Sequence, residues 1–249
     1  MKKLAVFNNK GGVGKSTISV QLAHGLALAG YKVLLVDMDN QNDCSLMLGV
    51  SEDSYKETFF NLIDKRYPAK LAECVIKART NLDLLPNSEY DVIKSEFHRE
   101  PNLNVVMGYA LEDAERMDYD YVVIDCSPEI GRINDAVLYY VDDLIVPVQL
   151  EAASIKGVKN IYQYLDRLRI SSDKIKLIVP NMMDKRTNES KENLEKLMEA
   201  FDGLDIVSNP ISRRTKITEA SNEGKTIYEY DEEAKKQFYD VLRRVSNFE

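Results

Sequence analysis

A stretch near the start of the chain combines glycine, lysine and serine at spacings that suit phosphate binding. Residues 6–18 read VFNNKGGVGKSTI, so three glycines precede Lys15 and Ser16. Glycines let backbone N–H groups approach a phosphate, and the Lys-Ser pair ends the pattern G-x-x-x-x-G-K-[ST], in which the lysine contacts the β- and γ-phosphates and the hydroxyl binds Mg²⁺. A glycine-rich turn without a ligand is the alternative. The residues expected to bind the nucleotide are Gly11, Gly12, Val13, Gly14, Lys15, Ser16 and Thr17.

The same stretch departs from that pattern at its first position. The pattern has glycine where this chain has Asn9, and a second lysine, Lys10, follows directly. Lys10 is either a solvated loop lysine or a second cation beside the phosphates.

Three aspartates follow apolar runs in places that suit a ligand site. Asp37 and Asp39 lie at the end of KVLLVD and just beyond it, and Asp125 ends YVVID. Open parallel sheets bind ligands at the carboxyl ends of their strands, and alternate residues of an extended chain point to the same side. We therefore expect the carboxylates of Asp37 and Asp39 to lie near the phosphates. An aspartate that caps the next turn is the alternative, and it stays open for Asp37.

The elements that position these residues read as alternating strands and helices. Short runs rich in Val, Ile and Leu are typical of strands buried on both faces of a parallel sheet. Helix-length segments separate them, such as STISVQLAHGLALAG, which Gly30 should end. The pattern predicts a doubly wound α/β fold, with a mostly parallel sheet flanked by helices. The expected strands are 4–8, 32–37, 82–86, 121–126, 144–149 and 176–181, with a further probable strand at 205–209.

The whole chain, 1–249, is expected to form one domain. Residues 50–80 are predicted to be an insertion of helices and loops, and residues 231–248 a terminal helix capped by Asp231, with Arg243 and Arg244 near its end.

Composition narrows the class of protein. The net charge of −8 argues against a chain that coats nucleic acid through bulk charge, so any such binding needs a local patch or an oligomer. Three widely spaced cysteines suggest neither a disulfide framework nor a zinc site. The apolar runs are far shorter than the roughly 20 residues that cross a bilayer, so a cytoplasmic location is expected.

Several motifs together resemble one family. KGGVGKST resembles the deviant Walker A motif of the ParA/MinD group of P-loop ATPases, with its signature lysine at Lys10. VLLVDMDNQND is similar to the family's second motif, D-x-D-P-Q-G-N, and YDYVVIDCSPEIG to its Walker B stretch, Y-D-x-x-x-x-D-C-P-P. VPVQLEAASIKGV and NPISRRTKITEASNEGKTIYEYD resemble later stretches of the partition branch. The resemblance extends over residues 3–231, with departures at Asn40, Asn42, Asp43 and Ser127.

The resemblance implies roles for the charged residues. Lys15 serves the ATP of its own subunit, and Lys10 reaches the ATP of the other subunit of an ATP-bound homodimer. Asp39 positions the attacking water and Asp125 holds Mg²⁺, while Asp37 is a supporting ligand or a structural partner of the loop. The implied catalytic residues are Lys10, Lys15 and Asp39, and the implied magnesium ligands are Ser16, Asp37 and Asp125.

Two further groups follow from the same resemblance. Asn181 and Pro210 occupy positions that surround the adenine, although a turn-forming role for Asn181 stays open. A basic group implies nonspecific DNA binding by the dimer, and a solvated face is the alternative because Glu219 and Glu223 lie nearby. The basic group comprises Arg213, Arg214, Lys216 and Lys225.

The implied function is a Mg²⁺-dependent, ParA-type ATP hydrolase that segregates a plasmid or chromosome on the nucleoid and is stimulated by a ParB-type centromere-binding protein. A MinD-like membrane-cycling ATPase is one alternative, but the brief YDVLRRVSNFE at the end favours no stable membrane association. The departures at 40–43 motivate another alternative, a nucleotide-gated regulatory scaffold with little hydrolysis.

Overall fold

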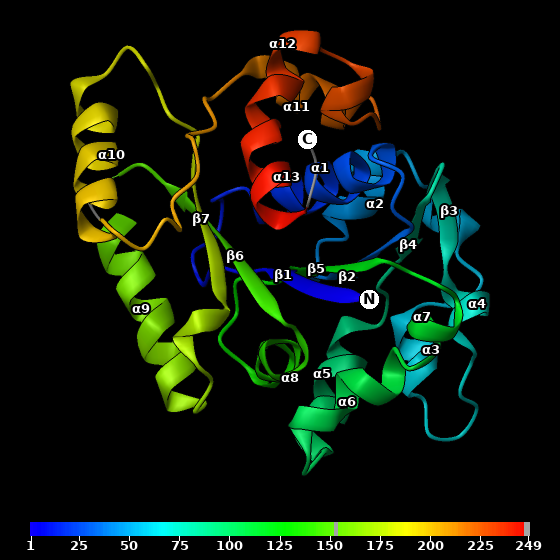
Figure 1. Cartoon of the computed structure of the whole chain (residues 1–249). Coiled ribbons are helices and arrows are strands. Elements are labelled where there is room, and N and C mark those ends of the chain that lie inside the picture. Colours follow the sequence, from blue (N-terminus) through cyan, green and yellow to red (C-terminus); the bar gives the residue numbers. More distant parts are fainter. Residues whose placement is uncertain (152–153, 247–249) are drawn as a thin grey trace.

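One sheet of seven strands forms the centre of the computed structural model, which describes residues 1–151 and 154–246 (Figure 1). The strand order is β3-β4-β2-β5-β1-β6-β7, and every neighbouring pair is parallel except β3 and β4. The predicted doubly wound α/β fold is confirmed. The strands are β1 Lys2–Val6, β2 Val33–Met38, β3 Ile76–Arg79, β4 Leu82–Leu85, β5 Tyr121–Cys126, β6 Asp143–Gln149 and β7 Ile175–Asn181.

Helices cover both faces of this sheet, which explains why the central strands are apolar at consecutive positions. Leu35 packs in the core on the side of α1 and α13, whereas Leu34 and Val36 pack in the core beneath α5, α6 and α8. Figure 1 shows these two layers above and below the sheet. Burial on both faces removes the polar alternation of a half-exposed strand.

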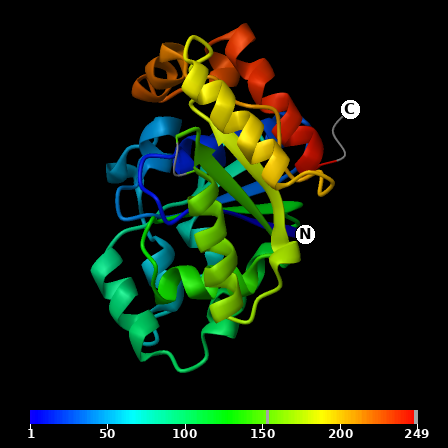
Figure 2. The ribbon, with the colours of Figure 1, turned by 90° about the vertical axis from the view of Figure 1, so that its left-hand side faces the viewer.

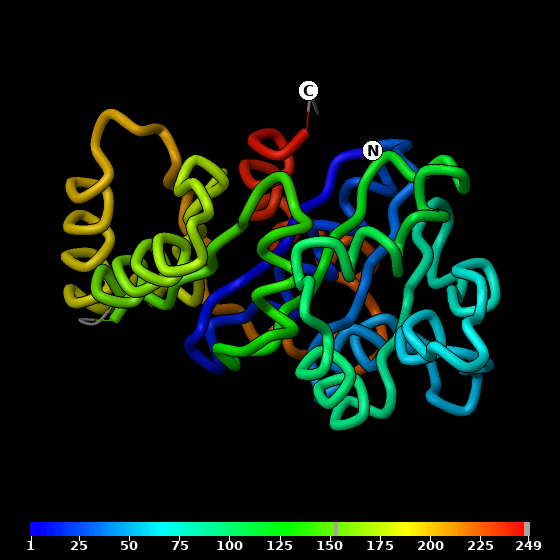
Figure 3. Tube along the Cα trace, turned by 90° about the horizontal axis from the view of Figure 1, so that it is seen from below, coloured from blue at the N-terminus to red at the C-terminus, as the bar shows by residue number. Residues whose placement is uncertain are grey.

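Figure 2 shows α9 and α10 in front of β7, and Figure 3 places this pair at the opposite end of the molecule from α3 and α4. None of the helices in the described part has the length and apolar character needed to cross a bilayer. The α-helices are α1 Lys15–Leu28, α2 Asp43–Leu48, α3 Phe59–Ile63, α4 Leu71–Cys74, α5 Tyr90–Arg99, α6 Leu103–Ala110, α7 Asp113–Arg116, α8 Arg132–Tyr140, α9 Ser154–Arg167, α10 Asn188–Ala200, α11 Thr215–Asn222, α12 Glu232–Lys235 and α13 Tyr239–Val245. The 3₁₀ turns are η1 Glu52–Ser54, η2 Ser172–Lys174, η3 Ile227–Glu229 and η4 Lys236–Phe238.

The expected helix boundaries are largely confirmed. Helix α1 ends at Leu28, and Gly30 adopts a left-handed φ of 95° just beyond it. The Asp231 carboxylate accepts hydrogen bonds from the backbone N–H groups of Glu233 and Ala234, as a helix cap does. The terminal helix runs through α12 and α13 with η4 between them, and residues 247–248 of the prediction lie outside the described residues.

Two expectations about the sheet edges are wrong. The insertion 50–80 contains a strand, β3, because the chain turns back at Asn81 (φ 59°) and pairs with β4. Strand β3 has no fully buried residue, since three of its residues are half-buried and Lys77 is exposed, so it lacks a continuous apolar run. At the other edge, residues 205–209 form only an isolated bridge between Ile178 and Val207. The segment 206–213 still follows β7, but the prolines at 180 and 210 lack the N–H groups of a regular ladder.

Candidate functional site

The loop between β1 and α1 is held by side chains from neighbouring strands. Asn8 donates to the carbonyl of Pro147 at 2.7 Å and accepts from the backbone N–H of Lys10 at 2.9 Å. The Asn181 amide donates to the carbonyl of Val13 at 2.8 Å. Gly14 has a φ of 90°, and a Cβ placed on it would lie 2.3 Å from the Asn181 nitrogen. Only glycine fits here, and the loop delivers the free N–H groups of the α1 N-terminus to the surface.

A cleft of about 400 Å³ opens at this N-terminus, beyond the carboxyl ends of β1, β2 and β5. It brings the predicted phosphate-binding glycines together with Lys15, Ser16, Thr17 and Asp39, as the sequence predicts. Val13 is buried in contrast. Neither Asn181 nor Pro210 belongs to the described residues that line the cleft, so their contact with adenine stays a prediction. The cleft is lined by Gly11, Gly12, Gly14, Lys15, Ser16, Thr17, Asp39, Asn40, Gln41, Asp43, Met47, Pro128 and Met182.

Two fully buried carboxylates lie beneath the cleft. Asp37 and Asp125 are partners in register on the neighbouring strands β2 and β5. Asp125 accepts hydrogen bonds from the Ser19 hydroxyl at 2.8 Å and the Cys44 thiol at 3.5 Å. Asp37 accepts from the backbone N–H groups of Asp39 and Cys44. Asp37 therefore both caps the following turn and stands beside Asp125, so both interpretations of it fit.

The donor set fits a hard divalent cation. The ligand atoms of Asp37, Cys44 and Asp125 all lie within 4.8 Å of one another, and the Ser16 hydroxyl lowers the pKa of Asp125. Oxygen ligands suit Mg²⁺, and two buried carboxylates side by side favour a bound cation or a proton. Sequence reasoning missed Cys44, because Mg²⁺ does not prefer a thiol and nothing in the sequence places it against Asp125.

Burial dominates the titration of this group. Burial and the neighbouring Asp125 charge raise the pKa of Asp37 well above its usual range, and burial raises the pKa of Asp125 to about 6. Burial also raises the pKa of Asp39.

These shifts predict how stability without Mg²⁺ depends on pH. The folded state keeps protons that the unfolded chain releases near pH 4, so the free energy of unfolding should fall as pH rises from about 4 through about 6. Asp125→Asn should flatten this fall and be about 1–3 kcal/mol more stable than the wild type at pH 7. Urea unfolding in EDTA at several pH values measures this. The exposed Asp166→Asn is the control, and equal pH slopes for wild type and Asp125→Asn would contradict the assignment.

Lys10 is not among the described residues that line the cleft. Its ammonium lies 2.6 Å from the carboxylate of Glu151, which follows β6, and the two side chains are 48% and 47% exposed. Exposed ion pairs contribute at most about 1 kcal/mol, so Lys10 is readily released. No sequence pattern indicated Glu151 as its partner.

A second groove is lined by basic side chains. This basic groove, of about 550 Å³, is formed by the loop after β7 and the segment before α11. It contains the predicted Arg213, Arg214 and Lys216, and adds Lys185 and Arg186, which sequence reasoning missed. Lys225 does not line it, and its ammonium pairs with Glu223 at 2.8 Å. Two cations of the groove are also paired, Arg186 with Asp184 at 2.8 Å and Lys216 with Glu219 at 2.7 Å. The groove is lined by Met183, Asp184, Lys185, Arg186, Ser212, Arg213, Arg214, Thr215 and Lys216.

Comparison with known proteins agrees with this geometry. Residues 1–178 match the family described as AAA domain. The sporulation initiation inhibitor protein Soj of Bacillus subtilis is 31% identical over 255 residues, covering 98% of each chain. This chain belongs to the ParA/MinD family of P-loop ATPases.

Other members of the ParA/MinD family match over similar lengths. The chromosome partitioning protein ParA of Caulobacter vibrioides is 29% identical over 237 residues, covering 93% of this chain and 88% of that one. Among solved structures, an ATP complex of Cyanothece McdA superposes with a TM-score of 0.84 at 22% identity, covering 98% of this chain and 96% of the other. That structure supports the fold of this ParA/MinD-family chain.

Proposed function

We propose that this protein is a Mg²⁺-dependent ATP hydrolase of the ParA type that segregates a plasmid or chromosome. Its ATP-bound homodimer binds DNA nonspecifically in the cytoplasm, on the nucleoid, and a centromere-binding protein of the ParB type stimulates hydrolysis. One observation carries the proposal: Lys15, Ser16 and Asp39 line one cleft, with the Asp37–Asp125 pair beneath it. The identity with Soj and ParA proteins adds the partition role.

In this proposal each cleft residue has a role. Lys15, at the first turn of α1 and 6% exposed, neutralises the β- and γ-phosphates together with the helix N-terminus. Ser16 and Asp125, supported by Asp37, would hold Mg²⁺, which would neutralise the negative charge that develops on the transferring phosphoryl group. Asp39 accepts a hydrogen bond from the attacking water and orients it in line.

Lys10 acts in the partner subunit. Leaving Glu151, its ammonium reaches the nucleotide of the other protomer, so that dimer formation requires ATP. We place the adenine near Asn181, at the end of β7, and near Pro210, in the segment beside β7.

Lys10→Ala tests the dimer. The wild type is expected to dimerise and bind DNA only when ATP is present, and not with ADP or without nucleotide. Lys10→Ala should remain a monomer that does not bind DNA under all three conditions. Its free energy of unfolding should change by less than about 1 kcal/mol, because the lost ion pair is exposed. Light scattering and fluorescence anisotropy on the same samples measure both properties. A wild-type protein without ATP-dependent DNA binding at low salt would overturn the proposal.

The basic groove predicts which cations contact DNA. Arg186→Ala and Arg213→Ala should each weaken DNA binding by the ATP-bound dimer. Each phosphate contact that is lost should reduce the steepness of log affinity against log salt by about one. Lys225→Ala should have a smaller effect, because Lys225 does not line the groove. Salt titrations of duplex binding measure this. The control is Lys77→Ala on β3, and an equal loss there would show that bulk charge, not the groove, binds DNA.

A further inference from the structure

Cys44 brings a thiol to the buried carboxylate pair beneath the nucleotide cleft. It lies near the start of α2 and, like Asp37 and Asp125, is fully buried. Its thiol donates to Asp125 Oδ2 at 3.5 Å, and its backbone N–H donates to Asp37 Oδ2 at 3.2 Å. The Sγ atom and one oxygen of each carboxylate lie within 4.8 Å of one another. Small movements of these side chains would therefore bring all three onto one ion.

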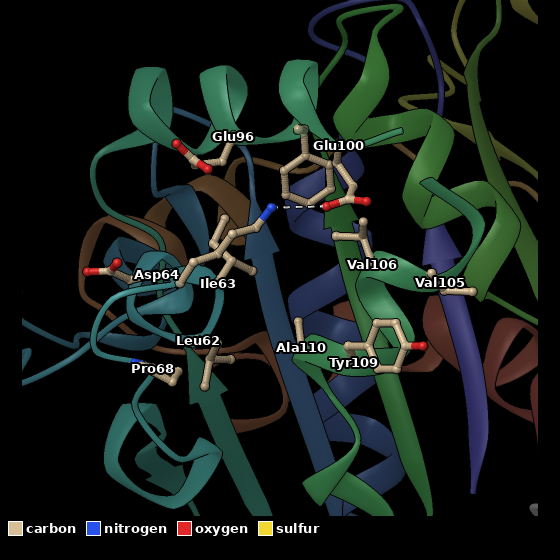
Figure 4. Close-up of a pocket in the computed structure, with 12 residues that line it drawn as sticks. Leu62, Ile63, Asp64, Pro68, Glu96, Glu100, Val105, Val106, Tyr109 and Ala110 are labelled. Atoms are coloured by element: carbon tan, nitrogen blue, oxygen red, sulfur yellow. Dashed lines mark hydrogen bonds and ion pairs between the residues drawn. The ribbon is translucent and has the colours of Figure 1, made fainter. Parts of the chain in front are cut away.

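No side chain that the structure describes supplies a positive charge in direct contact with this carboxylate pair. Carboxylates elsewhere have such a partner, and Figure 4 shows one at Glu100, which lies 3.3 Å from the Lys65 ammonium in a separate pocket between α3, α5 and α6. In residues 1–151 and 154–246, no lysine or arginine forms an ion pair with Asp37 or Asp125, and both accept hydrogen bonds from uncharged donors. Two buried carboxylates without a counter-ion favour a bound cation or a proton. This observation points to a ligand independently of the thiol.

The thiol decides which cation the three residues prefer. Mg²⁺ takes oxygen ligands, whereas Zn²⁺ accepts sulfur and carboxylate oxygen together, often with three protein ligands and a fourth open position. A tetrahedral ion with Zn–S and Zn–O bonds of usual length would hold a sulfur and an oxygen about 3.5 Å apart. Cys44 Sγ and Asp125 Oδ2 are already 3.5 Å apart. We propose that Asp37, Cys44 and Asp125 form a binding site for a divalent cation that prefers sulfur ligands, such as Zn²⁺, which competes with Mg²⁺ for Asp125.

Binding exchanges a proton for the cation. The Zn–S bond forms as the S–H bond of Cys44 breaks, and the proton passes to solvent. This loss also frees Asp125 Oδ2, because the thiol no longer donates to it. The three anionic ligands carry one negative charge more than Zn²⁺ neutralises, and Lys15 in the cleft above supplies the remaining positive charge.

The competition with Mg²⁺ rests on the proposed function, whereas the zinc site itself does not. A bound Zn²⁺ withholds Asp125 from Mg²⁺, so hydrolysis of ATP should stop while Zn²⁺ stays in place. Zinc binding is therefore measured on the nucleotide-free protein, and hydrolysis is measured separately.

X-ray absorption spectroscopy tests the site without any substitution. The full chain is freed of metal with a chelator and loaded with one equivalent of Zn²⁺. The spectrum should show one sulfur ligand at about 2.3 Å, together with oxygen ligands at about 2.0–2.2 Å. A zinc ion held by nitrogen and oxygen alone would overturn the proposal.

Cys44→Ser identifies the sulfur. A serine hydroxyl can still donate to Asp125 but offers Zn²⁺ no thiolate, so the sulfur signal should disappear. Losing a group that merely supports a metal ligand costs about 10–100-fold in affinity, so losing Cys44 should weaken Zn²⁺ binding at least about tenfold. Competition with a chromophoric chelator measures this affinity, and circular dichroism shows whether the variant is folded. Cys44→Ala takes its place if the serine variant does not fold.

The matched control is Cys74→Ser, which changes another buried cysteine, at the end of α4. It should keep both the sulfur signal and the affinity of the wild type. A sulfur signal that persists in Cys44→Ser, or one that disappears in Cys74→Ser, would contradict the assignment.

Hydrolysis of ATP with excess Mg²⁺ is then compared for the metal-free and the zinc-loaded wild type. A Zn–S bond in a protein that hydrolyses no ATP would remove the proposed function and leave the zinc site. Hydrolysis by a protein that forms no Zn–S bond would remove only the zinc site. Equal rates with and without bound Zn²⁺ would show that the two cations do not compete.

Discussion

Lys15→Ala should lower kcat for ATP hydrolysis by about 10²–10³-fold, the usual cost of removing one positioned charge from a developing anion. Lys15 as a whole residue is only 6% exposed at the helix N-terminus, so water replaces its ammonium poorly. Burial raises the pKa of Asp39 and of Asp125, and the Lys15 charge opposes that rise. The residual activity of the variant should therefore need a higher pH than the wild type.

Phosphate release at saturating Mg²⁺ and ATP across a pH series measures both effects. Lys77→Ala, on the exposed edge strand, is the matched control and should keep wild-type activity. If Lys15→Ala kept more than about a third of the wild-type rate, the cleft at α1 would not be the site of hydrolysis.

Gly14→Ala should both destabilise the fold and abolish nucleotide binding. The new Cβ would lie 2.3 Å from the nitrogen of the buried Asn181 amide, and the alanine would have to adopt a φ of 90°. Left-handed backbone costs a non-glycine residue about 1–2 kcal/mol, and displacing Asn181 loses its hydrogen bond to Val13. We expect the free energy of unfolding to fall by about 2–4 kcal/mol.

Urea unfolding and binding of a fluorescent ATP analogue measure the two losses. Gly157→Ala is the control: it lies within α9, and its added Cβ would meet nothing within 4 Å. It should be neutral or more stable by about 0.5–1 kcal/mol. A Gly14→Ala protein as stable as the wild type would show that the loop does not require its left-handed turn.

The phosphate loop and the central strands were predictable because the physics that forms them is local. Consecutive apolar residues in KVLLVD and YVVIDC require burial on both faces, and the glycines before Lys15 permit a turn that few other residues adopt. The same locality placed Asp37 and Asp125 at strand ends. That the two aspartates lie directly opposite each other could not be predicted, because it depends on β2 and β5 being neighbours in the sheet.

The unpredicted features depend on contacts between distant segments. Glu151 faces Lys10 because β6 lies beside β1, and 141 residues separate the two side chains. Arg186 joins Arg213 because the backbone N–H of Arg213 donates to Met183, which holds two loops together. Strand β3 was missed because its half-exposed residues form no apolar run.

The two margins of the sheet bear on how the protein self-associates. At one margin β3 is four residues long, carries Lys77 and Arg79 and has a register irregularity. At the other, the segment 206–213 forms backbone hydrogen bonds along part of β7, and this segment contains Pro210. Short, charged or proline-blocked margins resist joining the sheets of two molecules into amyloid-like stacks. The protein can therefore reach high local concentrations without its sheets joining edge to edge.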